Sequence, residues 1–143
     1  MNAAAAITEG KMEGKLVYIA SPYAGDVEKN TAFAKEACLY AIRQGGAPIA
    51  VHLLYPQLLE DSIPDQRQAG LRCGLRLLER CDELWVCGET VSSGMREEIC
   101  LAEELGIPIR AVSTQEIEAP IHPVHHRQET DLEPWEGDSH TLT

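Results

Sequence analysis

Short apolar runs alternate with longer amphipathic stretches along most of this 143-residue chain, and this alternation restricts the fold more than any other feature. The apolar runs are rich in β-branched and aromatic residues, whereas the longer stretches repeat their apolar residues at helical spacing. Strands that are joined by crossover helices form a parallel sheet with helices on both faces. We predict strands at residues 16–20, 47–51, 84–87 and 107–112, and helices at residues 27–44, from 62–64 to 81, and 94–105.

The third apolar run, residues 84–87 (LWVC), has no polar position. Such continuous hydrophobicity is typical of a parallel strand covered on both faces, so this strand is expected at the centre of the sheet. The predicted fold is α/β, a three-layer, Rossmann- or flavodoxin-like arrangement with four or five parallel strands. The favoured strand order is 2-1-3-4, which reverses between the first and third strands. The loops at residues 21–26 and 88–93 then face each other across the crevice in which such folds bind ligands.

The loop and helix start at residues 88–98 carry the most informative candidate site. Ser92, Ser93 and Gly94 would let a ligand approach the backbone, and the helix that they open would direct free N–H groups towards it. Glu98 lies about one turn inside this helix, within reach of the crevice. An ordinary helix cap followed by ordinary acidic residues is the alternative interpretation of the same pattern. The strand order gathers these side chains around the crevice: Tyr18, Ser21, Tyr23, Ser92, Ser93 and Glu98, with His52 at the rim.

The charge of the chain argues against one class of partner. The formal net charge is −11, and residues 15–112 hold ten basic against fourteen acidic side chains. A protein that binds nucleic acid polymers needs a basic surface, so no such partner is expected. Residues 3–7 form the first apolar stretch, which is too short to span a membrane and lacks the features of a signal peptide. We therefore expect no membrane partner and a cytoplasmic protein.

One domain is expected over residues 15–113, between two tails. Residues 1–14, which are rich in alanine, and residues 114–143, which are acidic and contain proline and histidine, are predicted to be disordered. Three of the four histidines in the second tail are candidate metal ligands but lack matching cysteines, so a solvated tail is preferred to a metal site, and no metal or cofactor is predicted. Five cysteines form no C-x-x-C pair and are expected to be reduced and buried. These three histidines are His122, His125 and His126, and the cysteines are Cys38, Cys73, Cys81, Cys87 and Cys100.

Three motifs, in order and at similar spacing, resemble the nucleoside 2-deoxyribosyltransferase-like superfamily, which includes the 2'-deoxynucleoside 5'-phosphate N-hydrolases. The first is the strand and loop at residues 18–23 (YIASPY), and the second is Asp82 before the third strand. The third runs from Gly94 through Glu98 to the Gly-Ile-Pro at residues 106–108. Residues 52–57 (HLLYPQ) and 81–86 (CDELWV) are most similar to an uncharacterised branch that is often associated with phages or prophages.

This resemblance implies a function for Glu98. The carboxylate would attack the anomeric carbon of a 2-deoxyribosyl group and form a glycosyl-enzyme ester, which divides one difficult displacement into two easier ones. Tyr18 matches the tyrosine that contacts this glutamate in relatives, although a plain aromatic core residue is an alternative for it. The resemblance also implies a nucleoside or nucleotide as partner and a homo-oligomer. The implied substrate-binding residues are Ser21, Pro22, Tyr23, Gly88, Ser92, Ser93 and Gly94.

Two positions depart from the family pattern. Gly74 stands where the deoxyribosyltransferases have an Asp that helps to protonate the leaving base. His52 is the candidate for that proton transfer, with a structural histidine at the rim as the alternative. Ser92, six residues before the nucleophile, matches the monophosphate hydrolases and favours a phosphorylated ligand, but the Arg that helps to hold phosphate in those enzymes falls at Ala24.

Three functions therefore remain open from the sequence. The first is an enzyme that cleaves or transfers the N-glycosidic bond of a 2'-deoxynucleoside or its 5'-monophosphate. The second is a nucleotide-binding or regulatory module without turnover, for which Gly74 is the best argument. The third is cleavage of the nicotinamide bond of a dinucleotide, since a glutamate in this position suits that chemistry too.

Overall fold

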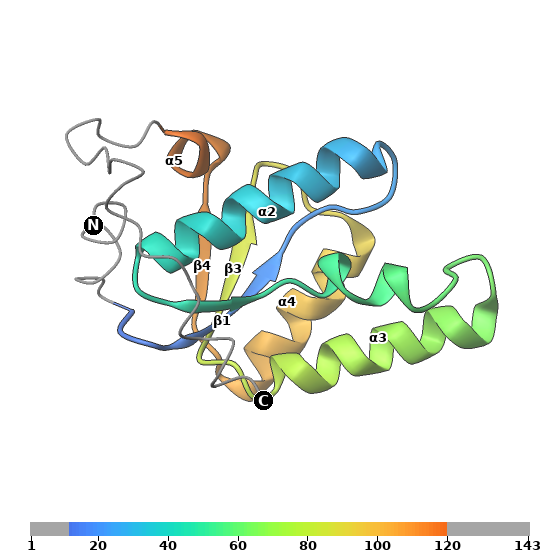
Figure 1. Ribbon diagram of the computed structural model, residues 1–143. Coiled ribbons are helices and arrows are strands. Elements are labelled where there is room, and N and C mark those ends of the chain that lie inside the picture. Colours follow the sequence, from blue (N-terminus) through green and yellow to red (C-terminus); the bar gives the residue numbers. More distant parts are fainter. Residues whose placement is uncertain (1–11, 120–143) are drawn as a thin grey trace, which may run out of the picture.

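Four parallel strands form one sheet in the order β2-β1-β3-β4, as predicted (Figure 1). The computed structural model describes residues 12–119. The strands are β1 (Leu16–Ala20), β2 (Ala47–Ile49), β3 (Glu83–Cys87) and β4 (Ile109–Val112). In the register, Tyr18 of β1 lies beside Ile49 of β2 and Leu84 of β3. β3 has a partner strand on both sides, so its predicted central place is confirmed.

Helices cover both faces of the sheet, which makes the predicted three layers (Figure 1). α2 (Val27–Arg43) and the short α5 (Thr114–Glu118) lie on one face. α3 (Pro64–Leu78) and α4 (Ser93–Leu105) lie on the other. Two short 3₁₀ helices, η1 (Val51–Leu53) and η2 (Tyr55–Gln57), connect β2 to α3. The chain therefore passes from the second strand across the carboxyl end of the sheet before α3 begins.

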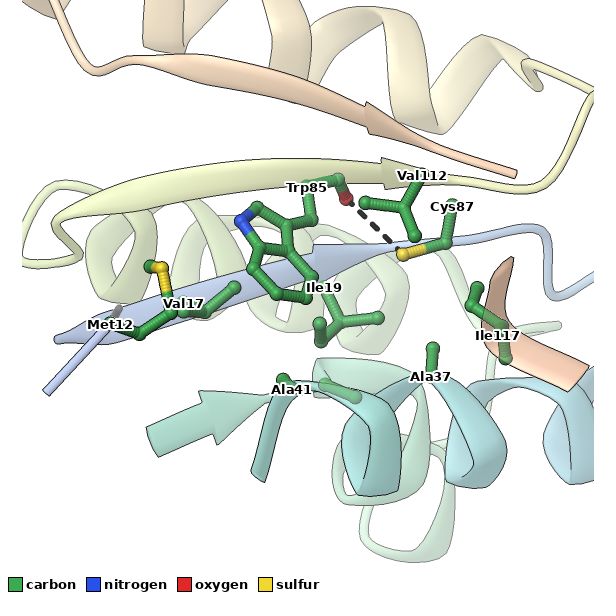
Figure 2. Packing of buried hydrophobic residues seen from close by; sticks show 10 residues of the cluster. Met12, Val17, Ile19, Ala37, Ala41, Trp85, Cys87, Val112 and Ile117 are labelled. Carbon is green, nitrogen blue, oxygen red and sulfur yellow. Dashed lines mark hydrogen bonds between the residues drawn. The ribbon is translucent and has the colours of Figure 1, made fainter. Parts of the chain in front are cut away.

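The core under α2 is built around Trp85, which is fully buried (Figure 2). Its indole Nε1 donates a hydrogen bond to Glu83 at 2.8 Å, and the Arg110 guanidinium lies 4.6 Å from the ring centroid. Ala37 and Ala41 face this core from α2 and let the helix approach the sheet closely. The large aromatic ring thus fills the space that the small helix residues leave.

A second core under α3 and α4 begins with the other face of β1. Successive residues of a strand point to opposite faces of a sheet, so Val17 and Ile19 join the Trp85 core while Tyr18 points towards α3 and α4. Tyr18 is completely buried there. The buried residues around it in this core are Ala20, Val51, Leu78, Cys81, Leu84, Met95 and Ala102. The pleat of one strand therefore places a phenol group inside the second core.

The folded part extends beyond both predicted limits, to Met12 at one end and to Glu118 at the other, and this corrects the prediction of disorder for these residues alone. α5 follows β4 directly, and Ile117 is only 1% exposed because it packs in the Trp85 core. Met12 is also buried in that core. Ser113 caps α5 by accepting a hydrogen bond from the Glu116 amide at 3.0 Å. The remainder of both predicted tails, with His122, His125 and His126, lies outside the described residues.

Two smaller expectations also need correction. The second strand ends at Ile49, since the backbone turns into η1 at Val51. All five cysteines are free, but only Cys81 and Cys87 are buried, and Cys100 is exposed on α4. Within residues 12–119, no helix has the length and apolar character needed to cross a membrane.

Candidate functional site

A cavity of about 290 Å³ opens at the carboxyl end of the sheet. Its walls come from the end of β1 and the following loop, from the η1–η2 segment, from α3, and from the start of α4. The reversal of strand order between β1 and β3 predicts a crevice at this end of the sheet. The cavity is lined by these predicted site residues: Tyr18, Tyr23, His52, Ser92, Ser93, Gly94 and Glu98.

Tyr18 and Glu98 meet at the cavity wall, although 80 residues separate them in the chain. The Tyr18 hydroxyl donates a hydrogen bond to Glu98 Oε2 at 2.6 Å. Both residues are buried, with Glu98 only 7% exposed. The other carboxylate oxygen, Oε1, is buried and accepts no hydrogen bond from the described residues. The pair therefore holds one oxygen of the carboxylate in place and leaves the second without a partner.

Burial governs the electrostatics of this pair. Loss of solvent raises the pKa of Glu98 to about 7, and the nearby Glu97 carboxylate acts in the same direction, while the hydrogen bond from Tyr18 opposes them. Burial and the adjacent Glu98 also raise the pKa of the Tyr18 hydroxyl, which stays protonated and remains a donor. At neutral pH the ionised and protonated forms of Glu98 are therefore present in comparable amounts.

Ser92 has the helix-capping role that the sequence offered as an alternative. Its Oγ accepts a hydrogen bond from the Met95 amide at 3.2 Å, and the residue also lines the cavity. Glu98, in contrast, is not explained by capping, because the first turn of α4 contains no acidic residue. A favourable interaction with the helix dipole is confined to the first turn. The burial of Glu98 on the inner face of α4 therefore has another cause.

At Gly94 the helix start is open towards the cavity. A Cβ atom built on this residue would meet nothing within 4 Å. A ligand can thus approach the first turn of α4 closely, as the small residues of this loop predict.

His52 lies in the cavity wall with its imidazole stacked on Tyr23. The ring centroids are 5.0 Å apart and the planes are inclined by 25°. Burial lowers the pKa of His52, while the carboxylate of Asp61 acts in the opposite direction. The stack fixes the orientation of the imidazole ring on one side of the cavity, next to the loop after β1.

Three residues predicted to bind substrate do not line the cavity: Ser21, Pro22 and Gly88. Ser21 is buried, and its Oγ has no hydrogen-bond partner among the described residues. Gly88 has a φ of +88°, and a Cβ there would lie 3.2 Å from the Phe33 ring. A glycine is thus required at residue 88 by the backbone conformation and by the packing against α2. The turn pattern in the sequence does not distinguish these two reasons from a contact with a ligand.

The wall formed by α3 was not predicted. Arg67, Gly70, Leu71, Gly74 and Leu75 all line the cavity from one side of this helix. The signal in the sequence was the pair of glycines at a spacing of four, since two helix-weakening residues on one face indicate a close approach. Gly74, the position of the departure from the family pattern, therefore belongs to the site itself.

Metal ligands are not gathered in the described part of the chain. Among residues 12–119, no three histidine, cysteine, aspartate or glutamate side chains lie close enough together to hold a metal ion. The polar groups of the cavity are instead carboxylates, hydroxyls, an imidazole and the Arg67 guanidinium.

A solved structure of a 2-deoxyribosyltransferase from the psychrotolerant bacterium Bacillus psychrosaccharolyticus has a similar fold. It superposes with a TM-score of 0.58 at 17% sequence identity, and the match covers 86% of this chain and 89% of that one. No curated protein matches the chain. Residues 15–112 match the model of a family described as a domain of unknown function, DUF7768. Because this match spans β1 to β4 and more than half of the sequence, the chain belongs to the DUF7768 family.

Proposed function

We propose that this protein cleaves or transfers the N-glycosidic bond of a 2'-deoxynucleoside or of its 5'-monophosphate, with Glu98 as the nucleophile. The observation that carries the proposal is the buried carboxylate at the cavity wall, with Oε2 held by Tyr18 and Oε1 left without a partner among the described residues. The fold shared with a 2-deoxyribosyltransferase and the motifs around Glu98 support the same chemistry.

The proposed reaction has two steps. Glu98 Oε1 attacks C1' of the 2-deoxyribosyl group, the C1'–N bond breaks, and its electron pair leaves with the base, which takes up a proton. Water or a second base then attacks C1' of the resulting ester, loses a proton and releases the Glu98 carboxylate. The Tyr18 hydroxyl keeps Oε2 in place throughout, so that the attacking oxygen is presented in one orientation.

The stability cost of Glu98 supports a functional role. An ionised carboxylate that is buried with one oxygen unpartnered destabilises a fold, and a glutamine or a methionine of similar size would not carry this charge. Residues that destabilise a fold in this way are concentrated at functional sites.

The leaving base still requires a proton, and Gly74 cannot provide one. We propose His52 for this step, because it lines the same cavity and is held by its stack on Tyr23. The Arg67 guanidinium on α3 and the Ser92 hydroxyl at the start of α4 line the same cavity and would suit a 5'-phosphate, although the Arg of the monophosphate hydrolases is replaced by Ala24.

The test is release of free base. The protein is incubated with the four 2'-deoxynucleosides, with their 5'-monophosphates and with NAD, and free base or nicotinamide is separated by chromatography. Release from a deoxynucleoside or its monophosphate supports the proposal, and a second added base distinguishes transfer from hydrolysis. Release from NAD alone would identify the dinucleotide reaction instead.

A nucleotide-binding module without turnover is the second candidate, favoured by Gly74 in place of the family's Asp. In that case calorimetry would detect binding of a nucleotide while no base appears even after long incubation. This outcome would contradict the proposed reaction.

A further inference from the structure

Gly74 lies inside α3 with its Cα facing the Tyr18 hydroxyl. A Cβ atom at this position would lie 3.2 Å from Tyr18 Oη, and 3.7 and 3.8 Å from the two methyl groups of Val51. The distances to Val51 are ordinary van der Waals contacts, whereas the distance to the hydroxyl oxygen is shorter than nine in ten of the contacts that real Cβ atoms make. Glycine in a helix interior is unfavourable compared with alanine, so its presence here requires a compensating reason.

The hydroxyl has little freedom to move away from α3. The Tyr18 side chain is fully buried among residues of β3, α3 and α4, and its position follows from the pleat of β1. The hydroxyl is also held in place by its 2.6 Å hydrogen bond to Glu98. A new atom on α3 would therefore act on the Tyr18–Glu98 pair rather than on a flexible surface group.

We propose that Gly74 is a positioning residue, whose missing side chain gives the Tyr18 hydroxyl the space from which it donates its single proton to Glu98. Its catalytic consequence rests on the proposed function, but the positioning itself concerns the Tyr18–Glu98 pair and holds with or without turnover. The departure from the family pattern at this position is then coupled to the buried pair, because a side chain at residue 74 of this chain would require the hydroxyl to shift by a few tenths of an ångström.

A substitution at Gly74 would change the strength of the hydrogen bond from Tyr18 to Glu98. Gly74→Ala would push the hydroxyl from its place and weaken its hydrogen bond to Glu98. A hydrogen bond to a carboxylate favours the ionised form, so weakening this bond raises the pKa of Glu98 further. Tyr18→Phe removes the hydroxyl, and in that background the added methyl group meets no oxygen.

The test is a double-mutant cycle of Gly74→Ala and Tyr18→Phe, read by titration of Glu98 in protein labelled with ¹³C at glutamate side-chain carboxyls. In the protein that keeps Tyr18, Gly74→Ala should raise the apparent pKa of Glu98 by about half a unit or more. In the Tyr18→Phe background, the same substitution should leave the pKa unchanged. It should also raise the melting temperature there, as alanine ordinarily does in a helix, and fail to do so beside Tyr18.

Gly70→Ala is the matched control, since its Cβ would contact only the flexible end of Leu59, at 3.4 Å from Cδ1. It should not shift the Glu98 titration. Equal pKa values of Glu98 in the parent and in Gly74→Ala would overturn the proposal. If Gly74→Ala does not fold, the Tyr18→Phe/Gly74→Ala double variant decides: recovery of folding supports the proposal, and failure of the double variant overturns it.

Turnover gives an independent second measurement. If the parent releases base, Gly74→Ala should lower kcat about tenfold, because the substitution weakens the hydrogen bond that holds the nucleophile. The change in KM should be smaller, since the substitution adds only one methyl group to the α3 wall of the cavity. A parent that releases no base would contradict the proposed function, while the titration would still decide on the positioning role of Gly74.

Discussion

The imidazole of His52 stacks on the phenol ring of Tyr23, at a centroid distance of 5.0 Å. This contact joins the segment after β2 to the loop after β1, so that two walls of the cavity touch each other directly. Because burial lowers the pKa of His52, its imidazole is mainly neutral at pH 7. Glu98, whose pKa is about 7, is only partly ionised at the same pH. The proposed reaction needs a protonated imidazole at His52 together with an ionised carboxylate at Glu98. At pH 7, each of these two forms is therefore present in only part of the molecules.

This relationship predicts the effect of His52→Gln. Replacing the acid should lower kcat for natural deoxynucleosides by roughly a hundredfold or more. Release of an aryl leaving group that needs no proton, such as p-nitrophenolate from its 2-deoxyriboside, should be much less affected. The variant's activity should rise with pH through about 7 and then stay level, because only ionisation of Glu98 remains to be observed. Equal losses with both substrates would instead assign His52 a structural role.

Glu98→Gln should abolish base release, with a loss of several orders of magnitude, because an amide is a poor nucleophile. Ligand affinity should be largely kept, since the side chain retains its size. Glu104→Gln, on the exposed side of the same helix, is the matched control and should leave the rate unchanged. Undiminished release by Glu98→Gln would refute the catalytic assignment.

The buried carboxylate also predicts how stability depends on pH. Burial raises the pKa of Glu98 from 4.5 to about 7 in the folded protein. Because the folded state favours the protonated form, its contribution is complete below about pH 4.5 and is lost as the pH rises through 7. The expected loss is roughly 3 kcal/mol of unfolding free energy. Urea unfolding between about pH 4 and 9 should show this decrease for the parent and its absence in Glu98→Gln; parallel curves would contradict it.

Ser92→Ala should destabilise the protein by about 1 kcal/mol, since the Met95 amide loses the Oγ that caps α4. The free energy of urea unfolding measures the effect. Ser93→Ala provides the comparison, because Ser93 is exposed and is already inside the helix, and it should cost much less. Similar values for the two variants would mean that the cap contributes little.

We expect a homo-oligomer, most simply a dimer. The cavity opens at the ends of loops that a domain of this size does not fully cover, and the proposed glycosyl ester is better protected when water is excluded. Sedimentation velocity at micromolar concentration should show a species of twice the monomer mass. A monomer alone under these conditions would contradict this expectation.

The architecture could be predicted from the sequence because it depends on local patterns of residues that are visible in the sequence itself. Continuous apolar runs identify the strands, and the glycine at residue 106 ends α4 in the left-handed conformation with a φ of +75°. The end of the domain was placed too early, at residue 113, since a five-residue helix with one buried side chain has no periodicity to detect. Only the tertiary contact of Ile117 with the Trp85 core reveals that helix.

The site could be predicted only where its residues lie next to recognisable turns. The strand order correctly brought Tyr18 and Glu98 to one cavity. Ser21, Pro22 and Gly88 belong to the same loops but do not line the cavity, because a loop pattern does not determine which of its residues face a ligand. The α3 wall was missed for a different reason. Gly70 and Gly74 contribute to it by lacking side chains, and the role of a missing side chain can be recognised only when the atoms that it would contact are known.

The loop between β3 and α4 is bound to α5 through Glu89. Its carboxylate accepts hydrogen bonds from the Thr114 hydroxyl at 2.6 Å and from the Thr114 amide at 3.0 Å. Thr114 lies beyond residue 112, where the match to the DUF7768 family ends. A chain shortened to that boundary would lose both the hydrogen bonds between Glu89 and Thr114 and the Ile117 side chain that packs in the Trp85 core. A shortened form of this protein that keeps both contacts therefore has to include α5, which ends at Glu118.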